Sequence, residues 1–296
     1  MTFEANEGWG GRRRWPAWEG LNLARITVDS DICIQCGECT EVCPGGFLEL
    51  GTDGLPKPGV WWEQECISCG HCVAVCPTGS ISHSAVPVEQ CSPLPENLEA
   101  NLDQLEPFFK GRRSIRVYQD KPVPREVLTR LLDIARVAPT GHNVQPLEWL
   151  VIDNRDVIRN FSRIAVDWMH WVLENNPELS KFLSMERLVK RQEAGQDEFL
   201  RDTPVLVVAH AHKRHVRTAT PASHIGLTYF YLAAGAVGLG CCWAGMFKDA
   251  AIDYPPLREA LALPEGHKPY ACLMVGYPVH TYRRLPARKP LEITWR

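Results

Sequence analysis

Two identical cysteine runs constrain this chain more than any other feature of its sequence. The first run is Cys33, Cys36, Cys39 and Cys43, followed by Pro44, and the second is Cys66, Cys69, Cys72 and Cys76, followed by Pro77. Both have the spacing C-x2-C-x2-C-x3-C-P, and together they hold eight of the twelve cysteines in 296 residues. A disulfide framework would need an oxidising compartment, of which the sequence gives no sign, and zinc sites use separated C-x2-C pairs instead of a triplet.

The spacing suits the ligation of [4Fe–4S] clusters. Three thiolates from one tight loop can reach three irons, whereas the fourth cysteine begins a helical turn and points away from its own loop. In a pair of such runs, the fourth cysteine therefore ligates the other cluster. We assign cluster 1 to Cys33, Cys36, Cys39 and Cys76, and cluster 2 to Cys66, Cys69, Cys72 and Cys43.

This region resembles the two-cluster bacterial ferredoxins over about residues 25–85, which implies electron transfer as its role. From Asp31 to Gln90 there are eight acidic side chains and one lysine, a side-chain charge of −7 before any cluster charge. Negative charge disfavours the reduced cluster, so it should lower the reduction potential. The acidic surface is equally consistent with docking of a basic redox partner and with simple solubility.

The whole chain has a net charge of only −3, which argues against a general nucleic-acid binder. Its first thirty residues lack the apolar core of a secretory signal. The uncharged stretch from Ile225 to Phe247 is long enough to span a bilayer, but five glycines interrupt it. A buried helix followed by a buried strand explains it better, so we expect no membrane span and a cytoplasmic location.

The sequence beyond a proline-containing connector alternates helices with strands. Helices are expected at 98–110, from Pro124, in two stretches over 155–200, from Pro221 with Thr220 as cap, and at 256–261; strands are expected at 148–152, 204–210, 241–246 and 270–275. This pattern predicts an α+β fold.

We divide the chain into an extension (1–24), a ferredoxin-like domain (25–85), a linker (86–107) and a second domain (108–296). The neighbours Trp168, Met169, His170 and Trp171 indicate helix packing more than a pocket.

Four segments of the second domain carry side chains suited to a phosphorylated heterocycle. They are Arg112, Arg113, Ser114 and Arg116; the loop with Pro139, Thr140, Asn143 and Gln145; the pair Ala244 and Gly245; and the tail with Arg288. Guanidinium groups bind phosphate through paired hydrogen bonds, amides read polar ring edges, and small residues allow close backbone approach. Each segment alone also fits a plain alternative: a solvated turn, a polar loop, tight strand packing or a basic tail.

Taken in this order, the four segments resemble the nitroreductase superfamily over about residues 108–296. The resemblance implies helices around a central mixed sheet and an obligate homodimer with FMN at the subunit interface. It also implies that Arg112–Arg116 and Arg288 hold the FMN phosphate and the edge of the flavin ring. The loop Pro139–Gln145 is then expected to reach the flavin of the other subunit. Ala244 and Gly245 are expected to lie beside the redox-active edge of the flavin ring. One departure is Leu147 after Gln145-Pro146, where the family often has tryptophan; here Trp149 follows two residues later.

A flavin exchanges electrons singly or in pairs, whereas each cluster moves one. The fusion therefore predicts an FMN-dependent oxidoreductase that converts single electrons into the two-electron reduction of a nitro compound, quinone or activated alkene. The donor is a ferredoxin-like carrier feeding the clusters, or NAD(P)H reducing the flavin while the clusters carry electrons outward. Exposed clusters suggest an anaerobic setting. Two alternatives stay open: a reductive dehalogenase like iodotyrosine deiodinase, and an electron-transfer or redox-sensing module without a substrate of its own.

Overall fold

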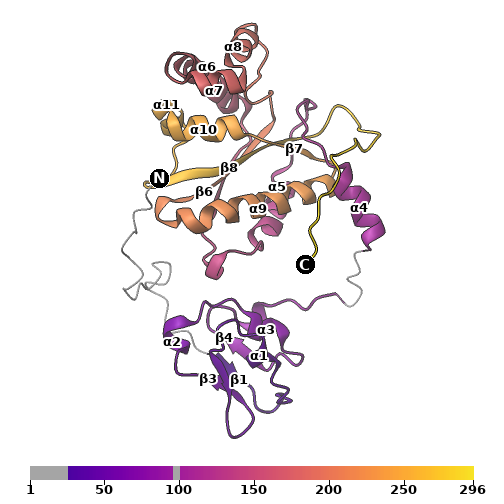
Figure 1. The fold of residues 1–296 in the computed structure, drawn as a ribbon. Helices are drawn as coiled ribbons and strands as arrows, with labels where there is room; N and C mark the ends of the chain where they lie inside the picture. The colour runs from indigo at the N-terminus through magenta and orange to yellow at the C-terminus, as the bar shows by residue number, and fades with distance from the viewer. Residues whose placement is uncertain (1–25, 96–100) are drawn as a thin grey trace. The chain divides into compact units, whose positions relative to one another are not determined.

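The computed structural model describes residues 26–95 and 101–296, which form two compact units (Figure 1). The first unit holds the described residues up to 95 together with His142–Val144, and the second holds the remainder from 101 onward. The predicted N-terminal extension, residues 1–24, lies outside the described residues. The exact domain boundaries therefore stay a prediction.

The first unit is built from short elements around the two cysteine runs. Its strands are β1 (Ile26–Val28), β2 (Leu48–Leu50), β3 (Pro56–Pro58) and β4 (Ile81–His83), and its helices are α1 (Glu38–Glu41), α2 (Trp62–Glu65) and α3 (His71–Val75), with a 3-10 turn at Val88–Gln90. Strand β1 pairs antiparallel with β4, and β2 with β3. A small core of Leu48, Trp62, Val73 and Ile81 also buries the thiols of Cys39 and Cys72. Because this core buries little apolar surface, the first unit is a candidate for stabilisation by bound metal.

The two cysteine loops repeat one backbone geometry. Gln35 and Ser68, each just before the second cysteine of its run, have φ angles of 57° and 49°. Gly37 and Gly70, each just after that cysteine, have φ angles of 78° and 73°. Left-handed residues among right-handed ones curl the chain and turn its backbone N–H groups toward the concave side. Both loops are therefore shaped to surround an anionic group.

The second unit is a four-stranded antiparallel sheet between two layers of helices (Figure 1). Its strands, in the order β5-β6-β8-β7, are β5 (Glu148–Ile152), β6 (Val205–His212), β7 (Gly240–Trp243) and β8 (His267–Gly276). Its helices are α4 (Leu102–Gly111), α5 (Arg125–Arg136), α6 (Arg155–Asn175), α7 (Pro177–Leu183), α8 (Met185–Glu193), α9 (Val216–Ala236), α10 (Gly245–Asp253) and α11 (Pro255–Ala260), with 3-10 turns at Gly141–Asn143 and Lys213–His215.

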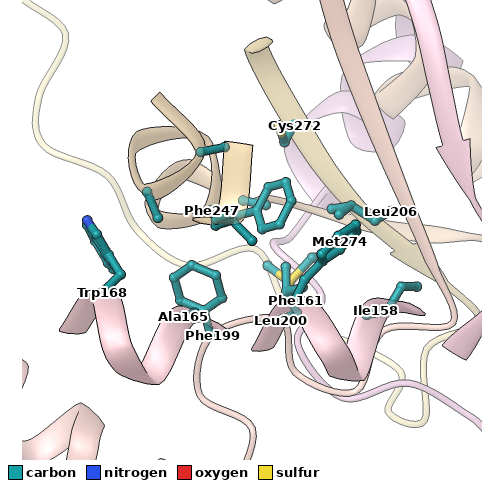
Figure 2. Packing of buried hydrophobic residues seen from close by; sticks show 14 of the residues in the cluster. Ile158, Phe161, Ala165, Trp168, Phe199, Leu200, Leu206, Phe247, Cys272 and Met274 are labelled. Atoms are coloured by element: carbon teal, nitrogen blue, oxygen red, sulfur yellow. The ribbon is translucent and has the colours of Figure 1, made fainter. Parts of the chain in front are cut away.

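Alternate residues of the strands enter two separate cores, because side chains point to opposite faces of a sheet in turn. Val205, Val207 and Ala209 of β6 pack with α5 and α9 on one face. Leu206 and Val208 pack with α6, α8 and α10 on the other. In this second core, Phe161 of α6 meets Phe247 of α10 at a ring-centroid distance of 5.6 Å (Figure 2). The central strands are thus buried on both faces, which explains why β6 reads as a continuous apolar run.

The α+β plan is confirmed, and so is the helix-then-strand interpretation of the uncharged stretch: α9 ends at Ala236 and β7 follows at Gly240. None of the helices in the described ranges is long and apolar enough to cross a membrane. The packing interpretation of the tryptophan cluster is also supported, since Trp168 lies in the α6 core with 1% of its surface exposed (Figure 2). Met169 is 0% exposed in the same core, whereas Trp171 is 43% exposed.

Helix α9 begins at Val216, not at Pro221 as the sequence suggested. Proline favours the first turn of a helix, where its missing N–H costs nothing, and this preference misplaced the start. The preceding turn is helical nevertheless. Thr220 does not cap the helix from outside, since its hydroxyl donates to the carbonyl of Val216 at 2.9 Å within it.

Other boundaries also differ from those expected. The strand predicted over 241–246 ends at Trp243, because the chain turns at Ala244 into α10, a helix the sequence did not reveal. The stretch 155–200 forms three helices instead of two, since Asn176-Pro177 and the left-handed Ser184 (φ 53°) interrupt it. The sheet expected to be mixed has only antiparallel pairs among the strands described.

Candidate functional site

Four cysteines of the first unit surround one pocket. Cys33, Cys36 and Cys39 from the first run share it with Cys76 from the second. Burial raises the pKa of the Cys39 thiol, and the nearby sulfurs of Cys36, Cys76 and Cys33 raise it further because thiolates repel one another. The fourth cysteine of the second run thus lies with the first three of the other run, which is the grouping assigned to cluster 1.

The remaining four cysteines form an equivalent group. Burial, then the neighbouring sulfurs of Cys69, Cys66 and Cys43, raises the pKa of Cys72 to about 11. Burial also raises the pKa of Cys66, with Cys69 and Cys43 adding to it. A thiol in such surroundings stays protonated unless a cation holds it as thiolate. The two groups of four converging sulfurs therefore fit iron–sulfur clusters, whose irons supply that positive charge.

Each group of four cysteines has hydrogen bonds to at least one of its sulfurs. Cys76 Sγ lies 3.3 Å from the Ser80 hydroxyl and 3.7 Å from that of Thr78. Burial would raise the pKa of Cys76, but hydrogen bonds from Ser80 and Thr78 and from the backbone outweigh it and lower the pKa to about 6. The backbone N–H of Phe47 donates to Cys43 Sγ at 3.3 Å. Such bonds stabilise negative charge on sulfur and so influence the potential of a bound cluster.

The arginine segment of the second unit is fixed by a tyrosine of α9. Arg112 Nη1 donates to the Tyr231 hydroxyl at 2.8 Å, and that hydroxyl lies 2.8 Å from the carbonyl of Arg113 and 2.6 Å from the carbonyl of Cys241. The N–H of Ile115 donates to the same Cys241 carbonyl at 3.0 Å. Tyr231 therefore connects the segment to α9 and to the edge strand β7.

The same segment contains one buried donor that the described residues leave unsatisfied. Arg113 Nε is buried and has no hydrogen-bond partner among the described residues, although Nη1 of Arg113 donates to the carbonyls of Arg112 and Lys110 at 2.6 and 3.0 Å. Arg116 and Ser114 lie against the Cys242 thiol. Burial raises the pKa of this thiol, whereas the contacts with Arg116 and Ser114 lower it. A buried donor without a partner costs about 1–3 kcal/mol, so an acceptor supplied by a ligand fits here.

Ala244 and Gly245 lie at the start of α10, immediately after β7. The Ala244 N–H donates to the Cys272 carbonyl at 2.9 Å, which fixes the turn to β8. Beside Gly245 the structure is open, since an added Cβ would meet no atom within 4 Å. The space next to the backbone N–H groups of this helix start fits a planar ligand edge.

The loop expected to contact a flavin lies elsewhere on the second unit. Thr140 and Gln145 line a shallow recess with Ala138, Leu147, Trp149 and Ala222, and the Gln145 N–H donates to the Thr140 hydroxyl at 3.0 Å. Pro139 precedes this recess. Asn143 belongs instead to the first unit, where its Nδ2 donates to the carbonyl of Ser68 at 3.0 Å and lies 3.4 Å from that of Ile67. Trp149, the displaced aromatic, packs on the core beside α9.

Arg288 lies in the exposed C-terminal segment, which has neither helix nor strand. The segment passes the end of α4, because Leu285 Cδ2 is 4.0 Å from the position of a Cβ at Gly111. No hydrogen bond or ion pair joins Arg288 to the other candidate residues in the described ranges. The structure thus groups Arg112–Arg116 with Ala244 and Gly245 near β7, and the segment that carries Arg288 passes Gly111, the residue before Arg112.

Tyr231 was not predicted from the sequence as part of the site. Helix α9 also carries Thr228 and Tyr229 close by, so no feature of its sequence singles out the Tyr231 hydroxyl. Its contacts to Arg112 and Arg113 join residues 118 and 119 positions apart, a relation that local patterns do not carry.

Comparison with known proteins finds two families along the chain. Residues 109–277 match the nitroreductase family, and residues 32–81 match the 4Fe-4S dicluster domain. A protein of Methanothermobacter thermautotrophicus, provisionally named NADH dehydrogenase/NAD(P)H nitroreductase, is 26% identical over 183 residues, covering 60% of this chain and 79% of its own. The iodotyrosine deiodinase of Haliscomenobacter hydrossis is 23% identical over 194 residues, covering 62% and 83%. A nitroreductase with bound FMN from Bacteroides fragilis has the same fold at a TM-score of 0.53 and 22% identity, covering 66% of this chain and 98% of that one.

Proposed function

The chain belongs to the nitroreductase family, since the family match spans more than half of its length, and we propose that it is an iron–sulfur flavoenzyme that reduces a small organic electrophile. The observation that carries the proposal is the presence, in one chain, of two groups of four converging thiols and of an arginine segment with a buried, unsatisfied donor. The converging thiols need a cation to hold them as thiolates, and the buried Nε of Arg113 needs an acceptor that the described residues do not supply.

We assign the two clusters as the sequence predicted, to Cys33, Cys36, Cys39 and Cys76, and to Cys66, Cys69, Cys72 and Cys43. The sulfurs that raise the pKa of Cys39 belong to the first set, and those that raise the pKa of Cys72 belong to the second. Each set would hold one [4Fe–4S] cluster through thiolates, releasing protons as it assembles. The short hydrogen bonds to Cys76 and Cys43 would then favour the reduced state of each cluster.

FMN is the cofactor that the second unit fits, and it would supply two-electron chemistry toward the substrate and one-electron exchange toward the clusters. Arg112, Arg113 and Arg116, together with Ser114, would bind its phosphate and the polar edge of its ring. Ala244 and Gly245 would offer backbone N–H groups beside the ring, in the open space that Gly245 leaves. Arg288 would join them from the C-terminal segment.

The two halves of the expected flavin site are far apart within one chain. Thr218, on the first half of α9, lies 3.4 Å from the Cβ position of Gly141 in the loop, whereas Tyr231 holds Arg112 on the second half. Tyr231 lies thirteen positions after Thr218, which is about 20 Å along the helix at 1.5 Å per residue. The loop residues Pro139, Thr140, Asn143 and Gln145 would therefore complete the site of a second copy.

An apolar face of α9 supports such a homodimer. Ile225 and Tyr229, one turn apart, are 37% and 41% exposed, and no charged side chain occurs from Thr218 to Ala236. An exposed, uncharged helix face of this length is typical of a surface that another protein covers. We therefore propose a homodimer with FMN at its interface.

Electrons would enter through the clusters from a ferredoxin-like carrier, because a direct nicotinamide donor makes no use of the dicluster domain. The opposite direction, from NAD(P)H to the flavin and out through the clusters, has support in the name of the methanogen relative. A reductive dehalogenase is a second candidate, favoured by the similarity to iodotyrosine deiodinase. The cytoplasmic location and the anaerobic setting also remain proposals.

A turnover assay without oxygen tests the proposal. Purified protein receives NADH, NADPH or a reduced ferredoxin as donor, and a nitroarene, a quinone or a halophenol as acceptor. We expect ferredoxin-driven reduction of the nitroarene or quinone. Rapid bleaching of the flavin by NADH or NADPH would reverse the proposed direction, preference for the halophenol would favour the dehalogenase, and no turnover with any pair would favour an electron carrier.

A further inference from the structure

Three side chains outside the flavin and cluster residues meet on the sheet of the second unit. Glu148 opens β5, His210 lies opposite it on β6, and His267 opens β8 on the other side of β6. Nδ1 of His210 is 3.1 Å from Nδ1 of His267, and Nε2 of His267 is 3.8 Å from Oε1 of Glu148. One potential ligand atom from each residue lies within 4.8 Å of the others.

The placement of His210 requires an explanation. It is 5% exposed and follows a run of buried apolar residues in β6, where a polar side chain needs a hydrogen-bond partner. Its nearest polar partner is His267, another imidazole. A pair of neutral imidazoles sharing one hydrogen bond would satisfy both Nδ1 atoms, but it would not require the carboxylate of Glu148 beside them.

The spacing of the nitrogens is that of ligands on one metal ion. Zinc–nitrogen bonds are about 2.0–2.1 Å, so two nitrogens on a tetrahedral zinc lie roughly 3.3 Å apart, close to the separation seen here. Glu148 now faces Nε2 of His267, on the side of the ring away from Nδ1, so its 59% exposed side chain must turn toward the two Nδ1 atoms to join them on one ion. One ligand atom from each of the three residues already lies within 4.8 Å of the others, which keeps this movement short. Neighbouring His212 is held differently, because its Nδ1 accepts the N–H of Arg214 and its Nε2 lies against Gly266.

We propose that Glu148, His210 and His267 form a binding site for a divalent transition metal, best fitted by Zn²⁺. Two imidazoles and one carboxylate are a ligand set that zinc uses with a fourth position open to water. The ion would join β5, β6 and β8. It would also fix the start of β5, three residues after Gln145 of the flavin loop.

The test uses the full chain with its clusters in place, so that iron occupies the cysteines. The protein is treated with a mild chelator, incubated with Zn²⁺ under nitrogen, desalted, and measured for zinc by mass spectrometry and by zinc X-ray absorption. We expect one zinc per chain, nitrogen and oxygen neighbours at about 2.0–2.1 Å, and a melting temperature that rises with added Zn²⁺.

Variants locate the site. Glu148→Gln, which alters a partly exposed side chain, should weaken zinc binding by about tenfold or more, and His210→Gln with His267→Gln should abolish it. The matched control His280→Gln removes an exposed histidine far along the chain and should bind zinc as wild type does. Zinc that survives in the double variant, zinc bound through sulfur at about 2.3 Å, or no bound zinc in the wild type would each overturn the proposal.

Discussion

The hydroxyl of Tyr231 should control both the stability of the second unit and its affinity for FMN. Tyr231→Phe removes this oxygen from Arg112 Nη1 at 2.8 Å and from the carbonyls of Arg113 and Cys241 at 2.8 and 2.6 Å. The Cys241 carbonyl keeps the N–H of Ile115 as a donor. The main loss is therefore the contact with the charged guanidinium.

The magnitude follows from that contact. A hydrogen bond to a charged group contributes about 1.5–3 kcal/mol, so the free energy of unfolding should fall by about 2 kcal/mol. Arg112, once it has lost this contact, must be ordered by FMN when FMN binds, and this ordering reduces the free energy of binding. If about 1.4 kcal/mol of the loss appears in binding, the Kd for FMN rises about tenfold.

The assay is a titration of the flavin-free protein with FMN, followed by flavin fluorescence, beside a thermal unfolding scan. Tyr254→Phe, which removes a hydroxyl at the C-terminal end of α10 and outside α9, is the matched control and should change neither quantity. If Tyr231→Phe lowers the melting temperature but leaves the Kd for FMN within twofold of wild type, the arginine segment does not bind the flavin.

Three further predictions concern other parts of the account. Gly245→Ile fills the open space at the start of α10, so it should weaken FMN binding while the melting temperature of the flavin-free protein stays near wild type; a normal Kd would place the ring elsewhere. Ile225→Glu puts a charge on the exposed face of α9 and should give a monomer with little FMN by light scattering and absorbance, whereas Ile134→Glu, an exposed isoleucine on α5, should stay dimeric. Ser80→Ala removes the hydroxyl 3.3 Å from Cys76 Sγ and should make the potential of that cluster more negative by on the order of 20–60 mV in a spectroscopic redox titration; an unchanged or higher potential would contradict the role given to that hydrogen bond.

The grouping of the cysteines could be anticipated from sequence because the spacing itself encodes the ligation geometry. Residues such as Gly37 and Gly70 adopt left-handed conformations at matching places in the two runs, and glycine is the residue that does so most easily. The contacts of the fourth cysteines are long-range, yet the repetition of the run made them predictable.

The candidate flavin segments could be proposed one by one from the sequence, but not their arrangement. The distance between the loop at Gly141 and the arginines at Arg112 depends on how α9 crosses the sheet, which no local pattern states. The start of α9 was misplaced because Pro221 gives a strong local signal that tertiary packing overrides. The histidine site depends on register across three strands, and β6 alone shows only an apolar run that ends in His210 and His212.

Transfer of single electrons from the clusters to the flavin is the central claim, and rapid mixing with a reduced ferredoxin under nitrogen measures it directly. We predict that wild type and Cys91→Ala, a control that alters an exposed thiol outside both runs, bleach their flavin absorbance at the same rate. Cys36→Ala should retain bound FMN but bleach at least about tenfold more slowly, a barrier higher by about 1.4 kcal/mol. Equal bleaching rates in Cys36→Ala and wild type would contradict the account.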